Sequence, residues 1–326
     1  MTLEIGVDST FAQSVGDRLM SIEDRLGASA FGDTPFVTEV ATHIINAGGK
    51  RFRPLLVVLA SQLYAGADQD AVERAAMVVE LTHVASLYHD DVMDEADLRR
   101  GAESANHRWS NSVAIMIGDF LFARASSIVA TLGVDYVALQ AETFARLVQG
   151  QIAETRGPSG DDDPVAHYLQ VVADKTGSLI AASAVFGGMV CGASEPVLRA
   201  LAAFGEEIGV VFQLSDDIID IASDSTGKTP GTDLREGVWT LPTLLVKAAA
   251  DPADTRLREL IGRRITDADE LAEALELMRA HPALATARAE VDRRAQLAKE
   301  LLSQLPESAA RDALYELCDQ VVSRST

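Results

Sequence analysis

Cysteine is scarce in this chain of 326 residues, which contains only Cys191 and Cys318. The two lie far apart, each in an apolar stretch, and no CxxC pair occurs. A disulfide framework, a cysteine zinc site and a redox dithiol therefore lack support. We expect the protein to work in a reducing compartment, the cytoplasm.

Basic residues are also few, since 28 Lys and Arg face 49 Asp and Glu and give a formal net charge of −21. This disfavours a nucleic-acid partner, because a phosphate backbone needs a basic protein face. The first residues lack a basic region followed by an apolar run, so we expect no signal peptide. One uncharged stretch, residues 176–194, approaches the length of a membrane span but is rich in Gly, Ala and Ser. It predicts a helix buried in a bundle, and we expect no transmembrane segment.

Aromatic residues (5%) and strand-like alternation are sparse, which argues against a β fold. Apolar residues instead recur every three to four positions, as in amphipathic helices. No change of composition marks a boundary, so we expect one all-α helical bundle over residues 1–326, with a motif-bearing core of about 36–250. The pattern predicts helices at about 36–45, 54–65, 70–96, 109–131, 134–157, 164–192, 196–223 and 240–250, and C-terminal helices within about 254–323.

Two DDxxD clusters stand out among the many acidic residues. On a helix, positions i, i+3 and i+4 share a face, so each cluster stacks carboxylates on one stripe, where they repel. One such motif alone could be a solvated acidic face. The second, however, lies in an apolar helix, where an unpaired carboxylate is costly. Oxygen ligands without His or Cys favour Mg²⁺, which also takes water and substrate phosphate. The clusters are Asp90, Asp91 and Asp94, and Asp216, Asp217 and Asp220.

The scarce basic residues gather close to these clusters in sequence. Arg offers two-pronged binding of phosphate oxygens and Lys a point charge. Pairing with the aspartates themselves is the alternative interpretation. The residues are Lys50, Arg51 and Arg53, then Arg99 and Arg100, then Lys175, and finally Lys228.

With these motifs the chain resembles the trans-isoprenyl diphosphate synthases, or polyprenyl synthetases. The likeness runs from about residue 48 to 242, and the ordered set is far more specific than one DDxxD. Its segments are GGKRFRP, ELTHVASLYHDDVMDEADLRRG, GDFLFA (118–123), GQIAET (150–155), KTGSL (175–179), FQLSDDIID (212–220), GK (227–228) and TDLREGVWTLP (232–242).

The resemblance implies a fold of the isoprenoid synthase type around a central apolar cavity, and the addition of isopentenyl diphosphate to an allylic diphosphate. It implies three Mg²⁺ ions, held by the six aspartates, and a homodimer. Asp90, Asp91, Asp94, Lys175 and Asp216 would be catalytic. The allylic diphosphate would bind Arg99, Lys175, Thr176, Gln213 and Lys228, and isopentenyl diphosphate would bind Lys50, Arg53, His83 and Arg100, with Arg51 in the same GGKRFRP motif.

In this family the residues four and five before the first DDxxD form the floor of the product tunnel. Here they are Ser86 and Ala85, both small. The resemblance therefore implies a long all-trans product, beyond C20 and in the range C30–C50, of the kind used for respiratory quinone tails. One position departs from the pattern, because Val238 follows Glu236-Gly237 where Lys is frequent, and one phosphate contact is in doubt.

Four alternatives stay open. The chain could be a geranylgeranyl or farnesyl diphosphate synthase of the same family. It could be a class I terpene cyclase, although those typically replace the second DDxxD. It could be a non-catalytic partner subunit, although those usually lose the aspartates. It could be an acidic helical scaffold that binds divalent ions.

Overall fold

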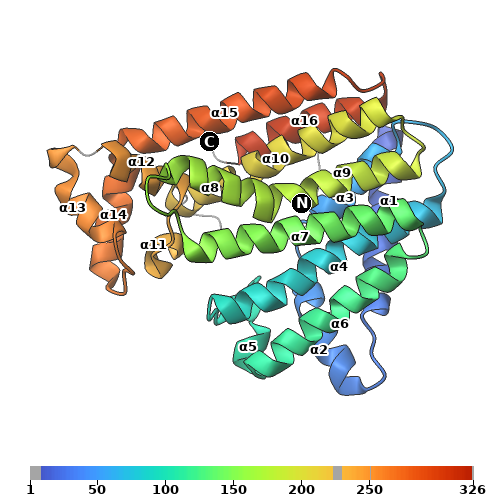
Figure 1. Cartoon of the computed structure of the whole chain (residues 1–326), viewed down its shortest axis with the longest axis horizontal. Helices are drawn as coiled ribbons and strands as arrows, with labels where there is room; N and C mark the ends of the chain where they lie inside the picture. Colours follow the sequence, from blue (N-terminus) through green and yellow to red (C-terminus); the bar gives the residue numbers. More distant parts are fainter. Residues whose placement is uncertain (1–8, 223–229, 250, 325–326) are drawn as a thin grey trace. The chain divides into compact units, whose positions relative to one another are not determined.

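The computed structural model describes residues 9–222, 230–249 and 251–324, which are almost entirely helical (Figure 1). The expected all-α fold class is confirmed. In chain order the elements are α1 (Ser9–Ser29), α2 (Pro35–Asn46), α3 (Phe52–Ser61), α4 (Gln69–Met93), α5 (Ala105–Arg108), α6 (Asn111–Val129), α7 (Val134–Arg156), α8 (Pro164–Val172), the π-helical turn η1 (Ala173–Gly177), α9 (Ser178–Val190), α10 (Glu195–Ala222), α11 (Thr232–Glu236), α12 (Leu241–Ala249), the 3₁₀ turn η2 (Pro252–Asp254), α13 (Thr255–Ile261), α14 (Ala268–Ala280), α15 (Pro282–Leu302) and α16 (Ala309–Ser323).

The chain divides into two compact units. The first consists of Met1–Ala145, Leu179–Ala202 and Gln304–Leu314, and the second of Arg146–Ser178, Ala203–Ser303 and Tyr315–Thr326. The first DDxxD belongs to the first unit, and the second DDxxD to the second unit.

The first unit is built around α4, which packs along α6 and against α3 (Figure 1). Asp68 starts α4 by accepting hydrogen bonds from the backbone N–H groups of Asp70 (3.4 Å) and Ala71 (3.3 Å). The buried faces of α2, α4 and α6 form one apolar cluster that includes Ile44, Tyr88 and Leu121. This core fixes the direction in which α4 ends, and the first aspartates lie at that end.

Helix α9 contains most of the uncharged stretch at 176–194, and the expectation that it is buried is confirmed. Its residues are buried or half-buried throughout. A side chain at Gly187 would place Cβ 2.4 Å from the carbonyl oxygen of Val57 on α3. Small residues therefore let α9 and α3 approach at backbone distance within the first unit.

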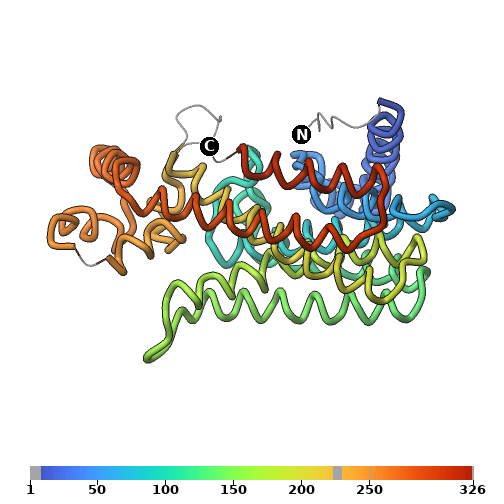
Figure 2. The backbone as a smooth tube through the Cα atoms, turned by 90° about the horizontal axis from the view of Figure 1, so that it is seen from above, coloured from blue at the N-terminus to red at the C-terminus, as the bar shows by residue number. Residues whose placement is uncertain are grey.

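In the second unit the chain turns back after α7, and α8 runs alongside the end of α7 (Figure 2). The ring nitrogen Nε2 of His167 on α8 lies 3.2 Å from the carbonyl oxygen of Ala153 on α7. Asp163 and Pro164 start α8, because the Asp163 carboxylate accepts from the N–H of Val165 (3.0 Å).

Three features differ from the expected pattern. Helix α1 was not among the expected helices. The segment expected as one helix over 164–192 contains the π-helical turn η1 between α8 and α9. Two short antiparallel strands, β1 (Leu98–Arg99) and β2 (Ala102–Glu103), follow the first DDxxD. Local composition does not specify these features, because packing partners elsewhere in the chain decide them.

Candidate functional site

The first aspartate cluster lies at the C-terminal end of α4, and Asp94 caps the helix. Carboxylates are unfavourable there, because the helix dipole places partial negative charge at this end. Asp91 is completely buried, and Arg99 Nε lies 2.5 Å from its Oδ1. Its Oδ2 is buried and has no hydrogen-bond partner among the described residues. Burial raises the pKa of Asp91, and the opposing effect of Arg99 does not cancel this rise. A cation or a hydrogen-bond donor at this oxygen would stabilise the charged form of Asp91.

Arg99 and Arg100 are held by the tight hairpin between β1 and β2. Arg100 has φ 55° and Gly101 has φ 79°, as a two-residue turn of this kind requires. Among the described residues, positive φ outside glycine occurs only at Arg51, Glu95 and Arg100. Such backbone conformations cluster at functional sites, and all three flank the predicted motifs of the first unit.

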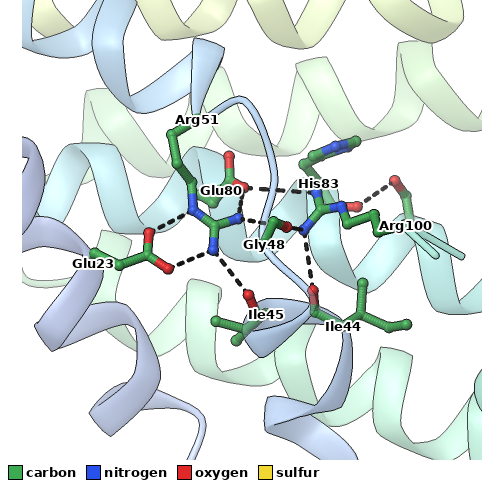
Figure 3. A network of polar contacts seen from close by, with 9 residues as sticks. Glu23, Ile44, Ile45, Gly48, Arg51, Glu80, His83 and Arg100 are labelled. Atoms are coloured by element: carbon green, nitrogen blue, oxygen red, sulfur yellow. Dashed lines mark hydrogen bonds and ion pairs between the residues drawn. The ribbon is translucent and has the colours of Figure 1, made fainter. Parts of the chain in front are cut away.

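Arg51 lies between two glutamates, one exposed and one buried (Figure 3). Its guanidinium contacts Glu23 at 2.5 Å and Glu80 at 2.9 Å, and it donates to the carbonyl oxygen of Ile45 at 3.0 Å. Every nitrogen of Arg51 thus has a protein partner. Through Glu23 on α1 and Glu80 on α4, Arg51 fixes the GGKRFRP loop to these two helices.

Arg100 lies on the other side of Glu80, with Nη2 3.9 Å from the Glu80 carboxylate (Figure 3). It also donates to the carbonyl oxygens of Ile44 (3.1 Å) and Gly48. Burial lowers the pKa of Arg100, and its neighbours Arg51 and Arg99 act in the same direction, while Glu80 opposes them. Glu80 is thus the buried counter-charge shared by Arg51 and Arg100.

Arg53 and His83 lie in the same positive environment. Burial lowers the pKa of Arg53 to about 10, with Glu80 opposing and Arg100 adding to the effect. The Nε of Arg53 is buried without a hydrogen-bond partner in the part of the chain described here. Burial, reinforced by four arginines, lowers the pKa of His83 well below its ordinary value. An excess of buried positive charge with an unused donor is an environment that binds a multivalent anion. Lys50, which precedes Arg51 in the chain, is exposed.

The second aspartate cluster lies near the C-terminal end of α10, again at the negative end of a helix dipole. Asp217 is 3% exposed and accepts hydrogen bonds from Gln213 Nε2 (3.0 Å) and from the Tyr168 hydroxyl on α8. Burial raises the pKa of Asp217 to about 7, and the charges of Asp216 and Asp220 add to this rise. Tyr168 and Gln213 therefore supply the hydrogen bonds that offset part of the burial.

The other two aspartates of this cluster have different partners. Arg324, the residue after α16, lies 2.6 Å from Asp216 Oδ1. Asp220 accepts from the backbone N–H groups of Thr232 and Asp233, each at 3.1 Å, and so starts α11. The end of α10, the start of α11 and the end of α16 are thus tied together within the second unit.

Lys175 and Thr176 lie in the π-helical turn η1 of the second unit. Lys175 Nζ is 2.5 Å from the Glu154 carboxylate on α7. The hydroxyl of Thr176 donates to Gln213 Oε1 at 3.3 Å, so it joins the hydrogen bonds that lead to Asp217.

Ala85 and Ser86 are buried on α4, one turn before Asp90. Val238 is 43% exposed, and Lys228 lies outside the described residues. Among the described residues, no group of three or more His, Cys, Asp and Glu side chains converges closely enough to hold a metal ion alone. Mg²⁺ usually takes only one or two carboxylates and completes its shell with water and phosphate.

The structure adds residues that the sequence did not single out. They are Glu23 and Glu80 at the arginines, Tyr168 and Arg324 at the second cluster, and Arg146 and Asp174 at the π-helical turn. Of these, Glu80 carried a signal, because it is a charged residue directly after an apolar run of α4.

A family model described as Polyprenyl synthetase matches residues 34–278 of the chain. The chain belongs to the polyprenyl synthetase family. The resemblance expected from the motifs is confirmed, and the protein is a prenyltransferase.

Two curated relatives from Mycobacterium tuberculosis are similar over nearly the whole length of this polyprenyl synthetase. One is named nonaprenyl diphosphate synthase and is 46% identical, covering 97% of this chain and 95% of the relative. The other is named dimethylallyltranstransferase and is 40% identical, covering 97% of each.

Among solved structures, a geranylgeranyl pyrophosphate synthase from Corynebacterium glutamicum has a TM-score of 0.87 to this polyprenyl synthetase. It is 42% identical and covers 98% of each chain. Its crystals contain calcium and isoprenyl diphosphate.

One helix of the described residues, α6, is long and apolar enough to cross a membrane by length and composition, and a third of its apolar window is buried. The core helix of a globular unit passes the same test.

Proposed function

We propose that this polyprenyl synthetase adds isopentenyl diphosphate units to an allylic diphosphate and releases an all-trans polyprenyl diphosphate. The observation that carries this proposal is the buried arginine group of the first unit, in which Arg53 Nε is unpartnered among the described residues. A chain elongation needs a binding site for a second diphosphate beside the allylic one, whereas a terpene cyclase needs only one. The arginine group supplies such a site.

Each substrate has its own set of residues in this proposal. Arg53, His83 and Arg100, with exposed Lys50, bind isopentenyl diphosphate. His83 serves as a neutral hydrogen-bond donor, because burial, reinforced by the arginines, lowers its pKa and disfavours its charged form. The allylic diphosphate is held by Arg99, Lys175, Thr176, Gln213 and Lys228. Arg51 fixes the loop that carries Lys50 and Arg53.

The aspartates fit a hard divalent cation. The unpartnered Oδ2 of Asp91 is an available oxygen ligand, and both clusters offer carboxylate oxygens only. We propose three Mg²⁺ ions per site, held by Asp90, Asp91, Asp94, Asp216, Asp217 and Asp220. Bound magnesium would supply Lewis-acid stabilisation to the oxygens of the leaving diphosphate. The protein's part is to orient both substrates and to exclude water from the reacting allylic carbon in a central apolar cavity.

We further propose a product beyond C20, in the C30–C50 range, suited to the tail of a respiratory quinone. Two observations support this. Ala85 and Ser86, one turn before the first DDxxD, are small and buried, so no large side chain stands at this level of α4. The relative named nonaprenyl diphosphate synthase is 46% identical.

A shorter product is the second candidate, because a similar structure is named geranylgeranyl pyrophosphate synthase. One experiment separates the candidates. The protein is incubated with farnesyl diphosphate, isopentenyl diphosphate and Mg²⁺, and the products are identified by mass spectrometry. Products mainly of C15 or C20 refute the long-chain assignment, and an absence of diphosphate release refutes the reaction.

We propose that the chain acts as one polyprenyl synthetase domain, as a homodimer in the cytoplasm. In the first unit α6 exposes Ile115 (44%) and Met116 (60%), and α7 exposes Val134 (83%). A second copy would cover these apolar side chains. Among the described residues neither Cys191 nor Cys318 forms a disulfide, which suits a reducing compartment.

A further inference from the structure

The π-helical turn η1 joins α8 to α9 and carries Lys175 and Thr176. Its closing bond runs from the N–H of Ser178 to the carbonyl oxygen of Ala173, five residues back. Turns of this kind are rare and are frequently found at functional sites. The extra residue per turn changes the direction in which Lys175 and Thr176 project, compared with a regular helix.

Asp174, inside this turn, is bound through both carboxylate oxygens. Arg146 on α7 places Nε 2.5 Å from Oδ1, and Gln170 Nε2 donates to Oδ2 at 2.9 Å. Arg146 also extends Nη1 to the Glu206 carboxylate on α10, again at 2.5 Å. One guanidinium thus ties the turn to both neighbouring helices of the second unit.

The backbone of α7 also packs closely against η1 at Gly150, four residues after Arg146. A side chain at Gly150 would place Cβ 2.7 Å from the backbone nitrogen of Lys175. A side chain at Gly177 would place Cβ 3.3 Å from the carbonyl oxygen of Glu206. The glycines allow this close approach but form no side-chain bond that would orient η1. Arg146 forms such bonds, to Asp174 in η1 and to Glu206 on α10.

The position of η1 determines the contacts of its side chains Lys175 and Thr176. Thr176 donates to Gln213, and Gln213 donates to Asp217. Lys175 pairs with Glu154, which lies two helical turns beyond Arg146 on α7. A shift of η1 would therefore displace Lys175 and Thr176 from the second aspartate cluster together.

We propose that Arg146 is a positioning residue, which acts through Asp174 to hold η1 so that Lys175 and Thr176 face the allylic diphosphate. This rests on the proposed function for the choice of ligand. The side chain of Arg146 is 37% exposed and that of Glu206 39% exposed. Ion pairs with such exposure contribute little stability. The bridge therefore matters for geometry more than for the folding of the unit.

The chain offers a matched control. Arg294 on α15 also bridges two carboxylates, Glu207 at 2.9 Å and Glu290 at 2.7 Å, and Glu207 is the neighbour of Glu206 on α10. Arg294 is less exposed than Arg146, 17% against 37%. Its replacement should disturb stability at least as much, but it has no contact with η1.

The experiment compares Arg146→Gln, Asp174→Asn and Arg294→Gln in the full-length protein. The first two should raise KM for farnesyl diphosphate about tenfold while KM for isopentenyl diphosphate stays within about twofold. The double variant should be no worse than either single variant, because both break the same contact. Arg146→Lys, which keeps the charge, should recover part of the loss. Equal KM values for farnesyl diphosphate in Arg146→Gln and Arg294→Gln would overturn the proposal.

A second measurement does not depend on activity. Amide hydrogen exchange at residues 173–178 should be faster in Arg146→Gln than in the wild type, and unchanged in Arg294→Gln. Unchanged exchange in Arg146→Gln would overturn the positioning role, whatever the enzyme makes. A wild type that forms no product, together with the expected exchange pattern, would instead reject the proposed function and leave Arg146 as the anchor of η1.

Discussion

Arg324 and Asp216 form an ion pair of 2.6 Å between residues 108 positions apart. The guanidinium carbon of Arg324 also lies 5.1 Å from the centre of the Phe212 ring, one turn before Asp216. The Arg324 guanidinium is thus paired with Asp216, a carboxylate that we propose as a magnesium ligand.

Removal of the Arg324 guanidinium should increase the apparent affinity of the second aspartate cluster for Mg²⁺. We expect Arg324→Gln to lower the Mg²⁺ concentration at half-maximal activity severalfold, because Arg324 no longer competes for Asp216. Arg324→Lys, which keeps the charge, should stay close to the wild type. The measurement is a Mg²⁺ titration of the initial rate, and identical midpoints for the Gln variant and the wild type would contradict the idea.

Neutral replacement of the aspartates should greatly lower activity without unfolding the protein. We expect Asp91→Asn and Asp216→Asn each to lower kcat by about 10²–10³-fold, the usual loss when one group that stabilises transition-state charge is removed. Asp135→Asn, at an exposed position of α7, is the control. Rates are measured by diphosphate release and folding by circular dichroism. Near-normal rates in the first two variants would reject the metal assignment.

The hydroxyl of Tyr168 should affect magnesium use through Asp217. In Tyr168→Phe the ring still fills its space, but Asp217 loses a donor that favours its charged form. We expect weaker apparent Mg²⁺ affinity and a melting temperature within a few degrees of the wild type. Tyr136→Phe is the control, because it removes a hydroxyl from a ring that packs on Phe186 within the first unit. Equal Mg²⁺ midpoints for the two variants would count against the role of Tyr168.

A large side chain at Ala85 should shorten the product. We expect Ala85→Phe to shift the main product by several isoprene units, because the ring would fill space at the level of α4 where we propose that the growing chain passes. Overpacking of a buried site destabilises by about 1–3 kcal/mol, so the melting temperature is recorded alongside. A folded variant with an unchanged product distribution would exclude Ala85 from the tunnel floor.

His83 should make the unliganded protein less stable in acid. Its pKa is lowered in the folded state, so below about pH 6.5 the unfolded chain binds the proton that the folded one excludes. Stability should therefore fall as pH decreases from 7 to 5, and less steeply in His83→Asn. Urea unfolding at several pH values, without phosphate in the buffer, provides the test. Parallel curves for the two proteins would show that His83 is not the titrating group.

Local features of the protein can be predicted from its sequence more fully than long-range contacts can. Helical spacing places α2, α4, α6, α7 and α10 within a few residues of their observed ends. The burial of α9 follows from its lack of charge. The stacking of Asp90, Asp91 and Asp94 also follows from helix geometry, because neighbours on one helix are fixed by a single local rule.

The sequence by itself thus determined most of the helices, the carboxylate stripes and the family to which the chain belongs, since each depends on residues close together in the chain. Only the tertiary structure decided which charge meets which. Arg51 contacts Glu23 across 28 positions, Arg146 contacts Glu206 across 60, and the hairpin gives Arg100 its positive φ. Such pairs form where packed helices bring distant residues together, and periodicity contains no information about that approach.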